Sequence, residues 1–281
     1  MGARREAREA LAAAGLRPRK HWGQHFLCDG GVARRIVETA EIGPRSIALE
    51  IGPGLGALTD VLAVTAGRLY LIEIDQALAR RLEERYADNP RVRVLASDVL
   101  QVPLAGLVTE PSVTVVANLP YNVAIPILFR LLEVRARFPR AVVMLQREVA
   151  QRLAAPAGGP ARGVTSVLLQ TYASVRLAFG VSRRSFLPPP QVESAVVDIR
   201  WSPEPRVPIG DPAAWQEVVR AAFGQRRKML RNALGTLAGA RGLDAAGLEA
   251  AFAAAGVDPR ARAETLDLDA FGRLAQALGR A

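Results

Sequence analysis

Short apolar runs alternate with amphipathic stretches along the first half of the chain. The apolar runs predict buried strands at residues 46–51, 68–74, 92–95, 113–117 and 141–145. The stretches between them predict helices at residues 32–40, 57–64, 76–86 and 123–132. Strands that alternate with helices of this length indicate an α/β fold with a parallel, doubly wound, Rossmann-like sheet.

The pattern changes after residue 146. Two more helices are predicted at 148–153 and 165–172, and two more strands at 175–179 and 195–201. A proline run makes residues 186–190 a stiff, extended loop. Proline-rich residues 202–208 are typical of a linker, and everything beyond them is predicted to be helical. We therefore expect an N-terminal extension that includes a short helix, an α/β domain and a small all-α domain, at residues 1–19, 20–205 and 206–281.

Two helix faces stand out in the last segment. Spacings of three and four residues place one apolar set on a common face: Trp215, Val218, Val219, Ala222 and Phe223. In the next predicted helix, a turn of about 100° per residue places basic side chains on one side, which are Arg227, Lys228 and Arg231. It places apolar side chains on the other, which are Met229, Leu230, Ala233 and Leu237. The second helix should thus offer a basic face to solvent.

Composition narrows the class of protein. The chain has 281 residues, 50% of them hydrophobic, which suits one large or two modest domains. No apolar run could span a bilayer and the N-terminus lacks the apolar core of a signal peptide, so a cytoplasmic protein is expected. The single cysteine, Cys28, excludes an intramolecular disulfide and a multi-cysteine metal site, and no metal is expected.

Positive charge points to a polyanionic partner. The net charge is +10, and residues 176–241 hold eleven basic and five acidic residues. A basic surface in the second half of the chain is therefore the candidate for binding nucleic acid. A solvated surface without a partner is the alternative.

A glycine loop follows the first strand and opens a helix. Gly52, Gly54 and Gly56 alone are a weak signal, but Glu73 ends the next strand and Asp98 follows the third. This arrangement predicts a site for a nucleoside-containing cofactor, in which Glu73 binds the ribose hydroxyls and Asp98 the adenine amine. Glu50, just before the loop, would repel a diphosphate such as that of NAD. A carboxylate there suits the ammonium and sulfonium of S-adenosylmethionine, whereas ordinary capping acids are the alternative.

The tetrapeptide Asn118-Leu119-Pro120-Tyr121 follows the fourth strand, at the sheet edge where ligands bind in open α/β folds. Asn118 Oδ1 and a carbonyl at Leu119 or Pro120 could accept hydrogen bonds from a planar amine such as adenine N6. Such bonds would free the nitrogen lone pair to attack a methyl group held in line. Tyr121 could stack on a base drawn out of its helix. Phe186 could cover its other face or be a core aromatic, and a turn with a core tyrosine is the plain alternative for the tetrapeptide.

The sequence closely resembles the bacterial small-subunit ribosomal RNA adenine N6,N6-dimethyltransferases, from about residue 20 to residue 234. The motifs that carry the resemblance are GQHFL at 23–27, EIGPGLG at 50–56, NLPY at 118–121, MLQREV at 144–149, FLPPPQV at 186–192, SAVV at 194–197 and RRKMLRN at 226–232. Their joint order makes the match specific. Two positions depart from the family pattern: His25 stands where Asn is usual, and Gln191 where Lys is usual.

The resemblance implies dimethylation of two adjacent adenosines near the 3′ end of 16S ribosomal RNA, in a maturing small subunit, by a monomeric enzyme. It implies an S-adenosylmethionine-dependent methyltransferase sheet followed by a helical domain that grips RNA. Cofactor-binding positions are His25, Leu27, Gly52, Gly54, Glu73, Ile74, Asp98, Val99 and Asn118. Catalytic positions are Asn118, Leu119, Pro120, Tyr121 and Phe186. RNA-binding positions are Arg147, Arg226, Arg227, Lys228 and Arg231.

Other functions remain open at this point. The chain could act mainly as a ribosome-assembly factor, with weak or dispensable catalysis. It could instead methylate adenine in 23S ribosomal RNA; the basic segment 226–232 and the proline-rich loop favour the small-subunit substrate. A DNA adenine methyltransferase is disfavoured because the sequence has no dedicated target-recognition segment.

Overall fold

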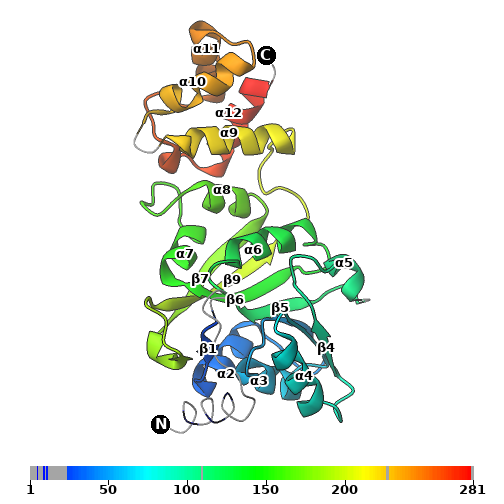
Figure 1. Ribbon diagram of the computed structural model, residues 1–281. Helices are drawn as coiled ribbons and strands as arrows, with labels where there is room; N and C mark the ends of the chain where they lie inside the picture. Colours follow the sequence, from blue (N-terminus) through cyan, green and yellow to red (C-terminus); the bar gives the residue numbers. More distant parts are fainter. Residues whose placement is uncertain are drawn as a thin grey trace. The chain divides into compact units, whose positions relative to one another are not determined.

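The computed structural model describes residues 24–108, 110–225 and 228–279, together with Arg5, Glu9 and Leu11. The helix expected at residues 1–16 falls largely outside the described residues. Packing divides the chain into two units (Figure 1). The first comprises Met1–Ala150 and Val175–Trp201, and the second comprises Gln151–Ser174 and Ser202–Ala281. Residues 151–174, which the sequence placed with the α/β domain, therefore pack with the helical unit.

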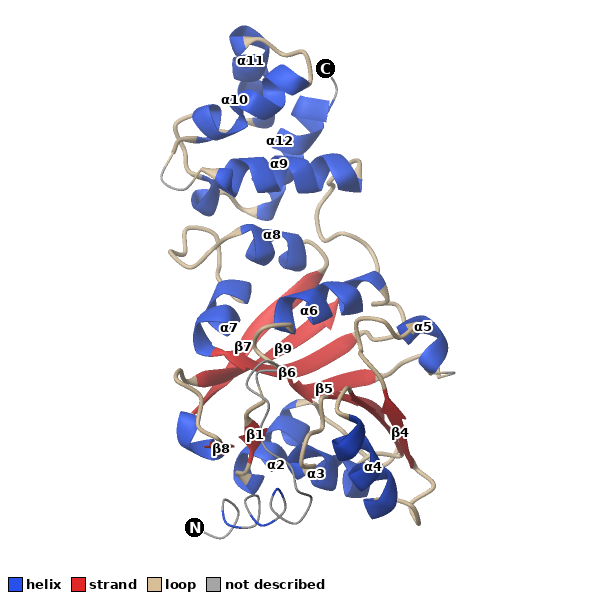
Figure 2. Ribbon diagram, in the orientation of Figure 1, coloured by secondary structure: helices blue, strands red, loops and turns tan. Residues whose placement is uncertain are grey.

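A seven-stranded sheet forms the first unit, in the order β4-β3-β2-β5-β6-β9-β7 (Figure 2). The strands are β2 (Ile47–Ile51), β3 (Arg68–Glu73), β4 (Val92–Ala96), β5 (Thr114–Asn118), β6 (Arg140–Gln146), β7 (Ala173–Val181) and β9 (Ser194–Trp201). Strands β2 to β6 pair in parallel, as the alternating pattern predicted. The sheet as a whole is mixed, because β9, a strand whose direction the sequence did not assign, runs antiparallel to β6. The connection from β7 to β9 has no α-helix of the kind that parallel crossovers use.

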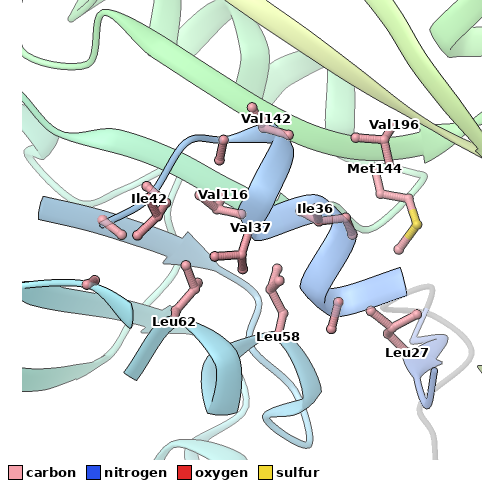
Figure 3. Packing of buried hydrophobic residues seen from close by; sticks show 14 of the residues in the cluster. Leu27, Ile36, Val37, Ile42, Leu58, Leu62, Val116, Val142, Met144 and Val196 are labelled. Atoms are coloured by element: carbon pink, nitrogen blue, oxygen red, sulfur yellow. The ribbon is translucent and has the colours of Figure 1, made fainter. Parts of the chain in front are cut away.

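Helices cover both faces of this sheet. They are α2 (Gly30–Thr39), α3 (Ala57–Thr65), α4 (Gln76–Arg85), α5 (Leu104–Leu107), α6 (Ala124–Glu133) and α7 (Arg147–Leu153). Helices α2, α3 and α4 lie on one face and α6 on the other (Figure 2). Ile36 and Val37 of α2 belong to one buried cluster with Leu58 and Leu62 of α3 and the strand residue Val116 (Figure 3). This core fixes the ends of β2 and β5, where the glycine loop and Asn118 lie.

A small antiparallel pair joins two distant segments of the first unit. Strand β1 (Phe26–Leu27) pairs with β8 (Phe186–Leu187), and Cys28 N–H donates to the carbonyl of Ser185 at 2.8 Å. The sequence did not predict either strand, because two residues carry no periodicity. The pairing holds the GQHFL segment against the proline-rich loop.

Helices make up the second unit. They are α8 (Val164–Gln170), α9 (Pro212–Gly224), α10 (Leu230–Ala240), α11 (Ala245–Ala255) and α12 (Leu268–Gly279), with a short 3₁₀ helix, η3 (Ala263–Thr265). The predicted apolar face of α9 is buried at Trp215, Val218 and Val219. The Trp215 ring meets Phe271 of α12 edge-on, with ring centres 6.2 Å apart.

The basic helix expected around residue 228 is not continuous. Helix α9 ends at Gly224 and α10 begins at Leu230, so Lys228 and Met229 precede the helix. Backbone N–H groups of Leu230 and Arg231 donate to the carbonyls of Ala261 and Pro259, which holds this entry to α10 in a non-helical path. Met229 is 38% exposed rather than part of an apolar face. Among the described residues, no helix is both long and apolar enough to cross a membrane.

Candidate active site

Two adjoining hollows lie at the carboxyl ends of the parallel strands in the first unit. They share Gly52, Ile74 and Pro120 as common lining residues. All three are predicted site residues, and the first hollow includes seven more: His25, Leu27, Gly54, Glu73, Asn118, Leu119 and Tyr121. The second includes two more, Asp98 and Val99. The structure thus brings together all predicted cofactor-binding positions along one edge of the sheet.

The glycine loop needs glycine for both conformation and space. Gly52 and Gly54 have φ values of +68° and +58°, which disfavour residues with a Cβ. A Cβ on Gly54 would lie 2.8 Å from the ring of Phe26 in β1. The N–H of Gly54 also donates to Glu73 Oε2 at 2.9 Å. The loop is therefore held between β1 and the acid at the end of β3.

Glu73 is an acid held by backbone donors. Its side chain is buried, and Oε1 accepts from the N–H of Asp75 at 3.0 Å while Oε2 accepts from Gly54. Burial raises the pKa of Glu73, and the two N–H donors act against that rise. Each carboxylate oxygen can accept more than one hydrogen bond. The carboxylate is thus fixed in orientation and keeps acceptor capacity toward the hollow.

Glu50 is the second buried acid of the first hollow. Its Oε2 accepts a hydrogen bond from Thr59 Oγ1 at 2.7 Å, and no described residue donates to Oε1. Burial is the main cause that raises the pKa of Glu50 to about 8, with a smaller contribution from the charge of Glu73. A carboxyl group in this state readily gains a cationic partner, because a nearby positive charge favours its ionised form.

Asp98 lies in the second hollow and also orders the loop after β4. Its Oδ1 accepts from the N–H of Leu100 at 2.9 Å, and Oδ2 lies 3.4 Å from Gln101 Nε2. This is the loop-stabilising arrangement that the sequence left open as an alternative, and it does not use all of the acceptor capacity of the carboxylate. Val99, beside it, is buried.

Asn118 is oriented by a backbone carbonyl across the hollow. Its Nδ2 donates to the carbonyl of His25 at 3.1 Å. Because the amide nitrogen is committed there, Oδ1 is left as an acceptor. The carbonyl of Pro120 accepts from the N–H of Val123, whereas no described residue donates to the carbonyl of Leu119. Asn118 Oδ1 and the Leu119 carbonyl are therefore the two available acceptors of the tetrapeptide.

His25 links the tetrapeptide to the proline-rich loop. Its ring stacks on that of Tyr121, with centres 5.8 Å apart and planes at 29°. Its Nδ1 lies 2.8 Å from the carbonyl oxygen of Pro188. Since a carbonyl can only accept, Nδ1 carries the proton. Tyr121 Oη lies 2.6 Å from Ser194 Oγ, and burial is the main cause that raises the pKa of Tyr121.

Several predicted site residues lie elsewhere. Phe186 is fully buried in the core, which agrees with the core-aromatic alternative that the sequence left open. Arg147 is exposed in the first unit, whereas Lys228 and Arg231 are exposed in the second. Arg226 and Arg227 lie outside the described residues.

Sequence reasoning missed four residues that shape the site. Phe26 supports Gly54, Thr59 holds Glu50, Ser194 holds Tyr121, and Gln24 lines the first hollow. Three of them belong to recognised motifs, GQHFL and SAVV, which was the available signal. Thr59 lies in a helix without any pattern that marks it.

Comparison with known proteins assigns the chain to a family. The family model for ribosomal RNA adenine dimethylase matches residues 15–276. The chain belongs to the ribosomal RNA adenine dimethylase family. One relative is ribosomal RNA small subunit methyltransferase A of Acidothermus cellulolyticus, which is 48% identical to this chain over 279 residues. The match covers 97% of this chain and 93% of the relative. The chain is 44% identical over 260 residues to the protein of that name from Syntrophotalea carbinolica, which covers 92% and 96% of the two chains.

Solved structures confirm the methyltransferase fold of this dimethylase-family chain. The 23S rRNA methyltransferase ErmE is 28% identical, with a TM-score of 0.69 and coverage of 90% of this chain and 99% of that one. A dimethyladenosine transferase from Plasmodium falciparum is 24% identical, with a TM-score of 0.73 and coverage of 89% and 96%.

Proposed function

We propose that this protein transfers methyl groups from S-adenosylmethionine to N6 of two adjacent adenosines in the 3′-terminal hairpin loop of 16S ribosomal RNA. The observation that carries the proposal is the fixed amide of Asn118. Its nitrogen is held by the His25 carbonyl, so Oδ1 is presented as an acceptor beside the Leu119 carbonyl, to which no residue in the described part of the chain donates. Family membership and the names of the small-subunit relatives support the same reaction.

The acids around the glycine loop fit S-adenosylmethionine. Glu50 Oε1 would receive the ammonium group, Glu73 the ribose hydroxyls, and Asp98 the adenine amine, with Val99 and Ile74 flanking the ring. A diphosphate-containing cofactor fits poorly, because the buried carboxyl of Glu50 lines the same hollow. When bound, the cofactor supplies an electrophilic methyl group on a sulfonium.

Asn118 and Leu119 would act on the attacking amine. The exocyclic nitrogen of adenine is a weak nucleophile, because its lone pair is delocalised into the ring. Two acceptors for its N–H bonds favour a tetrahedral nitrogen and hold it in line with the methyl group. Asn118 cannot take up a proton, so the proton released after attack passes to water. Tyr121, held by Ser194 and His25, would stack on the target base.

RNA binding would use the excess of positive charge. The net charge of +10 favours association with a polyanion, and Arg147, Lys228 and Arg231 are exposed cations at predicted contact positions. We propose that Arg226 and Arg227 contribute to the same contact. The partner would be an immature small ribosomal subunit in the cytoplasm, bound by a monomer of this protein.

A large-subunit substrate is the second candidate, favoured by the likeness to ErmE. Identity argues against it: the small-subunit relatives are 41–48% identical to this chain, compared with 28% for ErmE. An assembly role without catalysis is a third candidate, and the intact arrangement at Asn118 argues against it.

Methylation of isolated subunits would decide between these candidates. Under-methylated small subunits and, separately, large subunits would be incubated with the protein and labelled S-adenosylmethionine, and modified nucleotides would be mapped by mass spectrometry. We expect N6,N6-dimethyladenosine at two adjacent positions of 16S RNA only. Modification of 23S RNA, or tight subunit binding without any modification, would overturn the proposal.

A further inference from the structure

A hollow in the helical unit is lined by a buried arginine. The residues that matter here are Pro160, Arg162, Phe223, Gln225, Lys228 and Glu264, all of which belong to the same unit. Its volume is about 190 Å³. A water molecule occupies about 30 Å³ in the liquid, so the hollow has room for several waters or for a phosphate group.

Arg162 has one buried donor that no described residue uses. Its side chain is 6% exposed, and Nη1 donates to the carbonyl of Ala155 and to Gln170 Oε1, both at 3.1 Å. Its buried Nε has no partner among the described residues. Nor does any carboxylate of the described residues bond to the guanidinium. A buried charge without a bonded counter-ion is costly, and an anionic ligand would remove that cost.

The charges around Arg162 also favour an anionic ligand. Burial lowers the pKa of Arg162, and the negative charge of the exposed Asp267 acts against this. Lys228, exposed at the rim, adds a second positive charge, and Gln225 adds a neutral donor. Glu264 adds one negative charge, so the described lining residues carry a net charge of +1. This balance suits a singly charged phosphodiester better than a doubly charged phosphate monoester.

We propose that this hollow binds one phosphodiester of the RNA backbone. The inference rests on the proposed function for its RNA, but the site can be tested without RNA. The Arg162 guanidinium would donate to the phosphodiester, and Lys228 would contribute a second positive charge. Glu264 would weaken binding and disfavour free phosphate. Inorganic phosphate offers similar oxygen acceptors, so the experiment tests small anions and RNA separately.

The first arm uses small anions and the full-length protein. Dimethyl phosphate, a singly charged diester, should raise the melting temperature above that in chloride at equal ionic strength, and inorganic phosphate should do so less. Lys228→Gln should reduce this rise and Glu264→Gln should increase it, most of all for inorganic phosphate. Arg260→Gln removes an exposed charge of the same unit that neither lines the hollow nor belongs to the predicted RNA contacts, and it should leave the rise unchanged.

The second arm measures affinity for a small-subunit RNA fragment. Arg162→Gln should weaken binding about tenfold, the value of one hydrogen bond to a charged group. Arg162→Gln also loses the bonds to Ala155 and Gln170 and so could fail to fold. In that case, Lys228→Gln and Glu264→Gln test the site instead. Equal responses of Lys228→Gln, Glu264→Gln and Arg260→Gln to dimethyl phosphate would overturn the site. If instead the hollow responds as stated while no RNA is methylated, the site stands and the proposed function fails.

Discussion

At the scale of single residues, the site depends on how side chains are held in place. Asn118 is fixed on one side by a backbone carbonyl, and Glu73 is fixed by two backbone N–H groups. Fixed acceptors of this kind need little reorganisation when a substrate amine or hydroxyl arrives. The substitutions below separate residues that act on the substrate from residues that hold the site.

Asn118→Ala removes the acceptor and leaves the loop backbone in place. We expect single-turnover methylation to fall by about 100-fold or more, a typical loss for one preorganised polar group. Cofactor affinity, measured by calorimetry, should change by less than about threefold. Asn232→Ala, at an exposed position of the helical unit, is the control. An equal loss of cofactor binding would show that Asn118 serves mainly the cofactor.

His25→Asn restores the residue that is usual in the family. His25 contacts Asn118 through its backbone carbonyl, which the substitution keeps, so cofactor affinity should stay within about threefold. The free energy of unfolding should fall by about 0.5–1.5 kcal/mol, because the stack on Tyr121 is lost. Tyr121→Phe keeps the ring and loses only the contact with Ser194. A large change in cofactor affinity at unchanged stability would assign the His25 side chain to the cofactor.

Glu50 should make stability and cofactor binding depend on pH. Its pKa of about 8 in the folded protein lies above the ordinary value of 4.5, so the folded state holds a proton that the unfolded state releases between these values. This contribution to stability is full below pH 4.5 and is lost as the pH rises toward 8, by up to about 1.4 kcal/mol per pH unit. Glu50→Gln should flatten the decline in urea unfolding measured from pH 5 to pH 8.

Cofactor binding should remove the proton that folding retains on Glu50. A bound ammonium favours the ionised carboxylate, so binding at pH 7 should release a proton from Glu50. Calorimetry in buffers of different ionisation enthalpy would measure that release, and Glu50→Gln should abolish it. Equal proton release by both proteins would mean that Glu50 does not meet the ammonium.

At the scale of elements, some strands and helices follow from the local sequence pattern, whereas others depend on contacts between distant segments. Strands β2 to β6 were predictable, because each is an apolar run bounded by turn residues. The pair β1–β8 was not, because it depends on contact between Leu27 and Phe186, which are far apart in sequence. That contact also buries Phe186, which the sequence alone could not distinguish from an exposed aromatic. The start of α10 depends in the same way on the carbonyls of Pro259 and Ala261.

The contact of β1 with the glycine loop gives an element-scale prediction. Gly54→Ala adds a Cβ against Phe26 at a positive φ, which should cost about 1–3 kcal/mol of stability and displace the Glu73 contact. Cofactor affinity should fall by more than about tenfold. Gly235→Ala, in an open position of α10, is the matched control and should stabilise the protein by about 0.5–1 kcal/mol. Equal cofactor affinity in the two variants would contradict this use of the β1 contact.

At the scale of the whole molecule, the candidate catalytic residues and two of the predicted RNA-binding cations belong to different units of the chain. The candidate catalytic residues belong to the sheet unit, whereas Lys228 and Arg231 belong to the helical unit. The sequence placed the candidate site residues at one edge of the sheet, because acids and glycines at strand ends follow from the strand pattern. It could not predict the Arg162 hollow, because that depends on how the segment before α8 packs with α9 and η3.

Salt dependence tests the assignment of RNA binding to the helical unit. The variant R227Q/K228Q/R231Q removes three positive charges at predicted phosphate contacts. Each lost contact should lower the slope of log affinity against log salt by about 0.7–0.9, because fewer counterions are released on binding. The control R45Q/R80Q/R93Q removes the same charge from exposed positions of the sheet unit. Because both triples lower the net charge equally, a general field effect would change both slopes alike. Only direct phosphate contact predicts a selective change for the first triple, and an unchanged slope there would place the RNA surface elsewhere.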